Sequence, residues 1–227
     1  MWPYQNNEEW LLHCTSPIPG VDGYDYLVEL MAKQVRTLFG GVPGNLEEFA
    51  FASQAVQAEA LKFFIELFRS QKWRRTGIIW WNLINGWPQF STAVVDYYFE
   101  KKLAYDFIKR SQRPVCLMLK EPKKKEQELV VSNDTRKDVR VRYRLSDADT
   151  GKILAEGEKR ATNNSVTILT RIPFRGDEKR FYLIDWEDSF GAGRNHYLSG
   201  IPPFDLSGYK RWLRKCGFIA SSTSNKL

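Results

Sequence analysis

The residues with the clearest chemical potential are Trp81, Asn82, Asn85 and Trp87, which lie close together in the chain. The flat face of a tryptophan can stack on the apolar C–H side of a pyranose ring and exclude water from it. Asparagine side-chain amides donate and accept hydrogen bonds, so they can pair with sugar hydroxyl groups. We therefore take these four as candidate substrate-binding residues. The alternative is that the tryptophans only fill a core, and we favour that alternative for Trp80 and Trp87 but not for Trp81.

These residues lie at or just after the end of a short apolar run, Thr76–Leu83. Both alternating faces of the run are apolar, which is typical of a strand buried on both sides, as in parallel sheets and barrels. Barrel enzymes carry their sites at the carboxyl ends of such strands. The sequence thus predicts one buried strand that presents Trp81 and Asn82 at its end.

Three helices are expected around this strand, and the residues before them, 1–21, read as irregular. The first helix would run from about Gly23 to Leu38 with Asp22 as its cap, and the third from about Lys101 to Arg110. The second would run from about Leu46 to Ser70, because Asn45 followed by Glu48 resembles a capping box.

The second half of the chain reads as nearly all β. About seven short strands at even spacing are typical of an immunoglobulin-like sandwich. The expected strands are Val115–Lys120, Glu128–Ser132, Val139–Ser146, Ile153–Glu158, Val166–Ile172, Arg180–Trp186 and Asn195–Leu198. In the third of them strict alternation predicts that Arg140, Arg142 and Arg144 face water. A helix at about Leu206–Lys215 and a polar tail end the chain.

The net charge of +7 does not lead us to expect a nucleic-acid partner. The basic residues are spread along the chain and interleaved with 27 acidic ones. Their densest run, Lys123–Lys125, lies between Glu121 and Glu126 and reads as a solvated turn. A basic stripe on one face would be needed for phosphate-backbone binding.

Neither a membrane partner nor a metal is expected. No window is long and apolar enough to span a bilayer, and the first nine residues lack the features of a signal peptide. Cys14, Cys116 and Cys216 are few, far apart and without CxxC spacing. They indicate a reduced chain without a zinc site, which suggests a cytoplasmic location.

Several segments together resemble one family. The stretch Gly77–Ser91, followed by Val95-Asp96-Tyr97-Tyr98 and Lys102–Tyr105, resembles the last barrel strand of family-two glycoside hydrolases of the β-mannosidase and exo-β-glucosaminidase type. Residues 53–60 resemble the helix before that strand, and Pro114 with residues 132–134 resembles the start of the family's immunoglobulin-like domain. The likeness covers most of the chain in the family's order. One departure is Ile84, where many relatives carry Asn, and this leaves the sugar preference open.

The resemblance implies a fold class: an α/β partial TIM barrel, made of its last strand and flanking helices, followed by an all-β immunoglobulin-like sandwich. The expected domains are residues 1–113 as the C-terminal segment of a (β/α)8 barrel, 114–204 as the sandwich, and 205–227 as a C-terminal helix with a polar tail. By the same resemblance, Trp81 would line the subsite that holds the cleaved sugar.

The resemblance also implies that catalytic groups are missing from this chain. Retaining glycosidases use two carboxyl groups about 5–5.5 Å apart. The expected strand carries neither Asp nor Glu, and Glu59 and Glu66 lie within a helix. In the family the acid/base lies near strand four and the nucleophile ends strand seven, and both would precede Met1.

The chain is therefore expected to be a C-terminal fragment of a retaining, exo-acting glycoside hydrolase, with no catalytic residue, cofactor or metal of its own and no activity alone. Its partners would be a β-linked glycoside, bound through the complete barrel, and the missing N-terminal barrel segment in cis or in trans.

Two other functions stay open. A non-catalytic sandwich could bind carbohydrate or protein, although the β half offers few aromatic candidates, namely Trp186, Tyr197 and Tyr209. Nucleic-acid binding would show a steep salt dependence. Of the remaining polar residues, Asp96 is expected to support its loop through backbone hydrogen bonds, and His13 to be structural.

Overall fold

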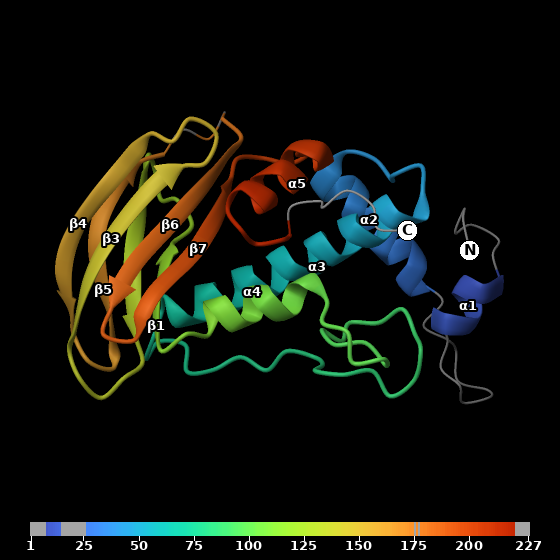
Figure 1. Cartoon of the computed structure of the whole chain (residues 1–227), viewed down its shortest axis with the longest axis horizontal. Coiled ribbons are helices and arrows are strands. Elements are labelled where there is room, and N and C mark those ends of the chain that lie inside the picture. The colour runs from blue at the N-terminus through green and yellow to red at the C-terminus, as the bar shows by residue number, and fades with distance from the viewer. Residues whose placement is uncertain (1–7, 15–25, 175, 177, 221–227) are drawn as a thin grey trace. The chain divides into compact units, whose positions relative to one another are not determined.

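The structure is a computed structural model that describes residues 8–14, 26–174, 176 and 178–220. Its helices are α1 (Glu8–Cys14), α2 (Tyr26–Phe39), α3 (Leu46–Arg69), α4 (Leu103–Ser111) and α5 (Leu206–Lys215). Its strands are β1 (Val115–Leu119), β2 (Glu126–Asn133), β3 (Val139–Asp147), β4 (Ile153–Ala161), β5 (Ser165–Pro173), β6 (Arg180–Asp188) and β7 (Gly191–Ser199) (Figure 1).

The chain divides into two compact units. The first contains residues 1–62, 79–108 and 202–206, and the second contains residues 63–78, 109–201 and 207–227. The domain limits expected from the sequence, at residues 113 and 204, stay a prediction.

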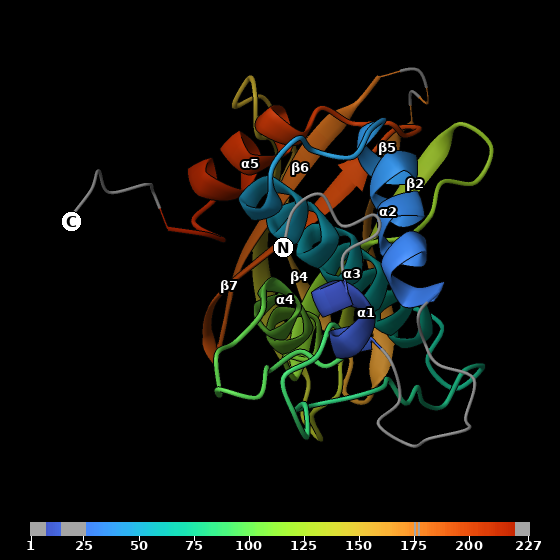
Figure 2. The same ribbon diagram turned by 90° about the vertical axis from the view of Figure 1, so that its right-hand side faces the viewer.

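The first unit is built on α1, α2 and the N-terminal part of α3, which lie side by side (Figure 2). Their buried side chains share one apolar core, in which the Trp10 ring stacks on Phe90 at 4.0 Å between centroids and meets the edge of Phe49 at 5.8 Å. The expected N-cap of α3 is confirmed, because the Glu48 N–H donates to the Asn45 Oδ1 at 2.9 Å. The cap expected at Asp22 lies outside the described residues.

Helix α1 corrects the prediction that residues 1–21 are irregular. Glu8 and Glu9 lie in its first turn, where acidic side chains favour the helix dipole. Trp10 and Cys14 are four residues apart, so they share one face of the helix, and both are buried. This helix of seven residues is held by packing more than by propensity, since isolated helices of this length are marginal in water.

The second correction concerns Thr76–Leu83, which is not a buried strand in this structure. Ile79, Trp81 and Leu83 are 97, 77 and 57% exposed. Among the described residues, no hydrogen bond involves the backbone of Gly77–Trp81, and Figure 1 draws this segment as an open coil. The physical reason is that a strand buried on both faces needs strands on both edges. Among the described residues, only the end of the run is paired, where Val94 and Val95 donate to the Asn82 and Leu83 carbonyls.

The second unit contains a β-sandwich, as expected. One sheet has the order β1-β2-β5 and the other β4-β3-β6-β7, with all pairs antiparallel (Figure 1). Buried side chains of both sheets form a common core. Burial alternates along β3, which confirms that its three arginines face water.

Four residues lie side by side across the four-stranded sheet, two aromatic residues in the middle and a glycine at each end. Tyr143 of β3 is paired with Trp186 of β6, and the outer partners are Gly157 of β4 and Gly193 of β7. A Cβ added at Gly193 would lie 2.1 Å from the Trp186 ring, whereas one at Gly157 would lie 3.1 Å from the Tyr143 hydroxyl. The rings therefore occupy space that only glycine leaves open.

The C-terminal end of α3 is joined to the sandwich through a buried carboxylate within the second unit. Glu66, only 6% exposed, accepts hydrogen bonds from the Ser111 hydroxyl at 3.0 Å and the Asn195 amide at 2.8 Å. The same Asn195 amide donates to the Leu117 carbonyl at 2.8 Å. One side chain thus links the helix, β7 and β1.

A second link joins the same end of the helix to the β2–β3 turn. Asp134 lies 3.0 Å from the Arg69 guanidinium and 2.7 Å from the Lys72 ammonium. Burial alone would raise the pKa of Asp134, but the two cations and the Ser132 hydroxyl outweigh it and hold the pKa below its usual value. The carboxylate therefore stabilises the fold while it is ionised.

Two negative findings concern the described residues only. None of the helices there is long and apolar enough to cross a lipid bilayer. The three cysteines are buried and form no disulfide.

We expect Gly193→Ala to destabilise the sandwich by more than about 2 kcal/mol, because its Cβ overlaps the Trp186 ring and forces a core side chain out of place. Gly157→Ala should cost less, since the contact there is 3.1 Å and involves the end of a side chain. Urea unfolding of each variant measures both effects. Gly44→Ala is the control, because a Cβ there meets nothing within 4 Å; equal losses in all three variants would contradict the packing argument.

Asp134→Asn should lower the free energy of unfolding at pH 7 by about 1 kcal/mol, as expected for a partly exposed ion pair. The pKa of Asp134 is lower in the folded state than in the unfolded state. Its carboxylate therefore adds to the free energy of unfolding above the unfolded pKa, about 3.9, and this contribution is lost as the pH falls below that value. Urea unfolding at pH 7 and at pH 3 should therefore show the difference shrinking in acid. Glu29→Gln, which removes an exposed pair with Arg36, serves as the control. If Asp134→Asn lowers the free energy of unfolding equally at both pH values, the carboxylate charge is not the cause of the loss.

Candidate functional site

The candidate residues lie in the first unit, in the segment between α3 and α4. The carboxyl end of the apolar run is held in place by backbone hydrogen bonds from Val94 to the Asn82 carbonyl at 3.2 Å and from Val95 to the Leu83 carbonyl at 2.9 Å. The peptide bond between Trp81 and Asn82 is cis. The Val94–Val95 segment thus fixes the backbone at Asn82 and Leu83, whereas the Trp81 backbone makes no hydrogen bond among the described residues.

Trp81 lies at a hollow of about 470 Å³ in this unit. Its walls include apolar side chains of α1, α2 and α3, and the hollow also takes in Asp96, Lys102, Gln54 and Ser91. Of the other candidates, Asn82, Asn85 and Trp87 are not among the lining residues. Trp81 is therefore the one sequence-predicted site residue that the structure brings together with charged and polar groups in a hollow.

Asn82 has an unusual polar environment. Its side-chain Oδ1 is buried and makes no hydrogen bond among the described residues. Its Nδ2 donates a long hydrogen bond of 3.5 Å to the Ile84 carbonyl. A buried acceptor without a donor costs free energy, so this oxygen can gain from a donor that approaches it.

Asn85 is only 4% exposed and holds the loop that follows the apolar run. Its Oδ1 accepts a short hydrogen bond from the Ser91 hydroxyl, and its Nδ2 donates to the Gln89 carbonyl at 3.4 Å. Ser91 Oγ in turn accepts from the Ala93 N–H at 3.1 Å. In this structure the side-chain amide is occupied in closing the 85–93 loop.

Trp87 is packed against His13. The two rings stack with centroids 5.8 Å apart, and His13 Nδ1 donates to the Pro88 carbonyl at 2.7 Å. The His13 carbonyl also accepts the Phe90 N–H at 2.9 Å. The histidine thus ties α1 to the loop, which confirms the structural role expected for it.

Asp96 supports its own loop, as expected. Its Oδ1 accepts the backbone N–H groups of Tyr98 at 2.8 Å and Glu100 at 2.9 Å. It is also the sole carboxylate among the described residues that line the hollow.

Two residues at this hollow were missed from the sequence. Lys102 donates from its Nζ to the Ser91 carbonyl at 3.3 Å, and burial lowers its pKa although the Asp96 charge opposes the shift. Gln54 Oε1 accepts the N–H of Leu103 at 3.0 Å and so caps α4. Both residues lie in stretches that carry the family resemblance, residues 53–60 and Lys102–Tyr105, but nothing in the local sequence places them beside Trp81.

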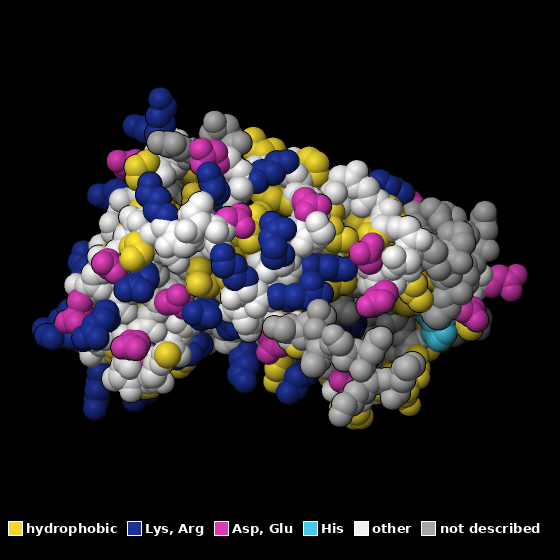
Figure 3. Space-filling view, turned by 45° about the horizontal axis from the view of Figure 1, so that its top comes forward, with side chains coloured by type: hydrophobic (Ala, Val, Ile, Leu, Met, Phe, Trp, Pro, Cys, Tyr) yellow, Lys and Arg dark blue, Asp and Glu magenta, His cyan; other side chains and the backbone are white. Residues whose placement is uncertain are grey.

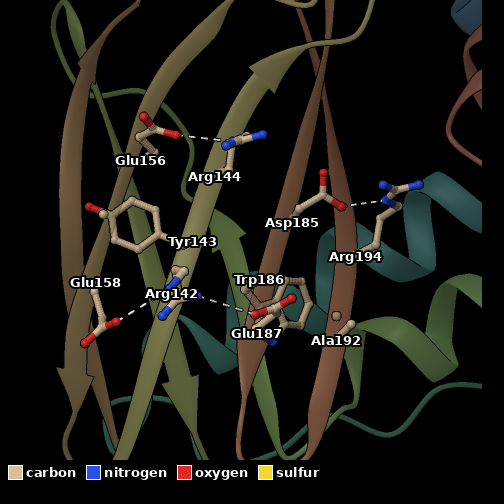
Figure 4. Close-up of a pocket in the computed structure, with 12 residues that line it drawn as sticks. Arg142, Tyr143, Arg144, Glu156, Glu158, Asp185, Trp186, Glu187, Ala192 and Arg194 are labelled. Atoms are coloured by element: carbon tan, nitrogen blue, oxygen red, sulfur yellow. Dashed lines mark hydrogen bonds and ion pairs between the residues drawn. The ribbon is translucent and has the colours of Figure 1, made fainter.

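A second hollow, of about 720 Å³, lies on the outer face of the four-stranded sheet (Figure 4). Charged side chains pair across the strands there, with Arg144 3.2 Å from Glu156 and Arg194 2.6 Å from Asp185. The two aromatic residues of this hollow are almost fully buried. The face thus offers no exposed aromatic platform, and it does not favour the alternative of a sugar-binding sandwich.

Comparisons with known sequences find β-mannosidases. No protein-family model matches the chain. Beta-mannosidase B of Aspergillus terreus is 28% identical over 134 residues, which are 49% of this chain and 15% of that protein. Beta-mannosidase B of Thermothelomyces thermophilus is 35% identical over 81 residues, which are 33% of this chain and 9% of that protein. The chain therefore spans only a small part of the curated relatives it matches.

Comparisons with solved structures find the same kind of protein. The β-D-mannosidase of Dictyoglomus thermophilum superposes with a TM-score of 0.70 at 22% identity, over 88% of this chain and 24% of that one. The exo-chitosanase of Amycolatopsis orientalis superposes with a TM-score of 0.63 at 19% identity, over 81 and 25% of the two chains. These likenesses show the fold. With the curated relatives they confirm the resemblance to the C-terminal part of family-two glycoside hydrolases.

We expect Ser91→Ala to lower the free energy of unfolding by about 1–3 kcal/mol, because it leaves the buried Asn85 Oδ1 without its donor. Asn85→Ala should cost a similar amount by opening the 85–93 loop. Thermal unfolding measures the loss, and proteolysis within the loop should become faster. Thr92→Ala, in the same loop, leaves the Asn85 amide bonded and is the control; a loss as large in Thr92→Ala would contradict the assignment.

Proposed function

We propose that this chain forms the C-terminal part of a retaining, exo-acting glycoside hydrolase of the β-mannosidase type. In this proposal it contributes the last barrel strand and one wall of the sugar site, together with a supporting sandwich, while both catalytic carboxylates lie on other polypeptide. The observation that carries the proposal is the exposed apolar segment Gly77–Trp81, whose backbone makes no hydrogen bond among the described residues.

The exposure of this segment supports a missing neighbour. Ile79 is almost fully exposed, and burying such a side chain is worth about 1.5–3 kcal/mol. Monomeric proteins seldom leave contiguous apolar surface open unless a partner covers it. The adjoining hollow is also walled mainly by apolar side chains of α2 and α3. A barrel strand on each edge would satisfy the backbone groups and cover the apolar ones together.

The chemical roles follow from the geometry. Trp81 presents an exposed ring that can stack on a sugar, and the Asn82 Oδ1 can accept a hydrogen bond from a sugar hydroxyl. Asn85 and Trp87, proposed as further substrate-binding residues, would act through the loop they hold. The substrate would be a β-linked glycoside, as the names of the relatives indicate, bound only when the barrel is complete.

The test is complementation with the N-terminal barrel strands of a β-mannosidase relative, supplied as a separate polypeptide. The chain alone should not hydrolyse an aryl β-mannoside, and the mixture should. Hydrogen exchange at the amides of residues 77–81 should be fast in the chain alone and slow in the mixture, because pairing protects strand amides. Protection without activity would show a barrel whose sugar site is incomplete.

A matched pair of variants locates the interface. Ile79→Lys should abolish complementation, because it places a charge where an apolar face must be buried. Ile153→Lys adds the same charge at an exposed isoleucine of β4 and should leave complementation unchanged. Hydrolysis by the chain alone, lost on mutation of one of its own carboxylates, would overturn the proposal. So would equal complementation by both variants.

A further inference from the structure

A hollow of about 430 Å³ in the second unit, apart from the candidate sugar site, is lined by three arginines: Arg110, Arg113 and Arg194. They come from the end of α4, from the residues just after it, and from β7. Residues 216–218, which follow α5, form another part of the wall. Asp185 is the sole carboxylate among the described lining residues, so three positive charges meet one negative charge and leave a net +2.

Each guanidinium is held in place by contacts with the protein. Arg194 Nε lies 2.6 Å from the Asp185 carboxylate, and its Nη1 donates to the Cys216 carbonyl at 3.0 Å. Arg110 lies over the Phe218 ring, 4.1 Å from its centroid. Positions fixed in this way reduce the entropy lost when a ligand is bound.

Arg113 has donors left over. Its Nη1 donates to the Ala192 carbonyl at 2.7 Å, and its guanidinium lies 5.6 Å from the Trp186 ring centroid. A guanidinium carries five N–H donors, and the described residues take one of them here. The remaining donors form the planar fork that matches the paired oxygens of a phosphate or carboxylate.

The surroundings add to the positive potential. Lys and Arg side chains gather over α5 in Figure 3, and they belong to Lys210, Arg211, Arg214 and Lys215. These side chains raise the local concentration of anions near the hollow but do not line it.

We propose that this hollow binds a small phosphate monoester. A net charge of +2 matches a phosphate dianion, and the arginine forks match its oxygens. The volume lies within the range of small-molecule pockets, about 300–1,000 Å³, so it has room for an organic group beyond the phosphate. Gly217 on the wall, where a Cβ would meet nothing within 4 Å, lets a ligand approach the backbone closely.

The test is calorimetric titration of the full 227-residue chain with inorganic phosphate and with glucose 6-phosphate, at matched ionic strength in chloride. Both should bind saturably, the ester more tightly, and glucose should not bind. Arg113→Gln should weaken binding about tenfold, the effect of about 1.4 kcal/mol. Asp185→Asn should instead strengthen it several-fold, because it removes the one opposing charge.

Arg211→Gln is the matched control. It removes one charge from the exposed face of α5, where its side chain is 66% exposed and outside the hollow, and should change the affinity less than twofold. Circular dichroism and the unfolding midpoint check that each variant is folded. Absence of saturable binding would overturn the proposal. Equal weakening by Arg113→Gln and Arg211→Gln would also overturn it, since that result describes a diffuse basic surface.

Discussion

The structure depends on one constraint: backbone N–H and C=O groups that leave water must find hydrogen-bond partners. In the second unit every strand has a partner within the chain, so the sandwich closes around its own core. The segment Gly77–Trp81, of which residues 79–81 belong to the first unit, has the composition of a doubly buried strand but no strand among the described residues to pair with. Its backbone therefore stays unpaired, and the Ile79 and Trp81 side chains stay exposed. The strands of the sandwich and the Gly77–Trp81 segment therefore differ in whether the described residues provide a pairing strand, and not in their strand-forming composition.

The same constraint explains why a helical segment belongs with the sandwich. A buried carboxylate is stable only when donors surround it, and Glu66 has donors from Ser111 and from Asn195 of β7. Removing either donor would leave this buried carboxyl group with fewer hydrogen bonds. Residues 63–78 are thus held to the strands by polar contacts as well as by packing, and they are part of the second compact unit. The domain limit expected at residue 113 came from the change from helical to alternating periodicity. That change in the local sequence carries no information about contacts between residues 63–78 and the strands.

Local pattern was sufficient to predict most of the elements. The helices α2 to α5 and the seven strands were found because each carries its own periodicity and its own turn residues. The strand β7 was predicted to begin at Asn195, but it begins at Gly191. Glycines normally weaken a strand, and Gly193 is there because the Trp186 ring, on another strand, occupies the space of its side chain. The reason lies in a tertiary contact that the local sequence does not contain.

The candidate site was predicted less well for the same kind of reason. The residue types at Trp81 and Asn82 suggested sugar binding. In the structure the Trp81 ring is exposed, and the Asn82 Oδ1 has no hydrogen-bond donor among the described residues. Asn85 has the same side chain as Asn82, yet its amide closes a loop with Ser91. Composition cannot separate these two asparagines, because the difference depends on which groups the folded loop brings to each amide.

The boundary between paired and unpaired backbone falls at the candidate site itself. Hydrogen bonds from Val94 and Val95 fix Asn82 and Leu83, whereas the residues just before them make none. Fixing the backbone of one residue costs about 1–2 kcal/mol of conformational entropy. That cost has already been met at Asn82 and Leu83, but not at Trp81 or the residues before it. A pairing strand would therefore have to order Trp81 and the residues before it, whereas the Asn82 backbone would already be held.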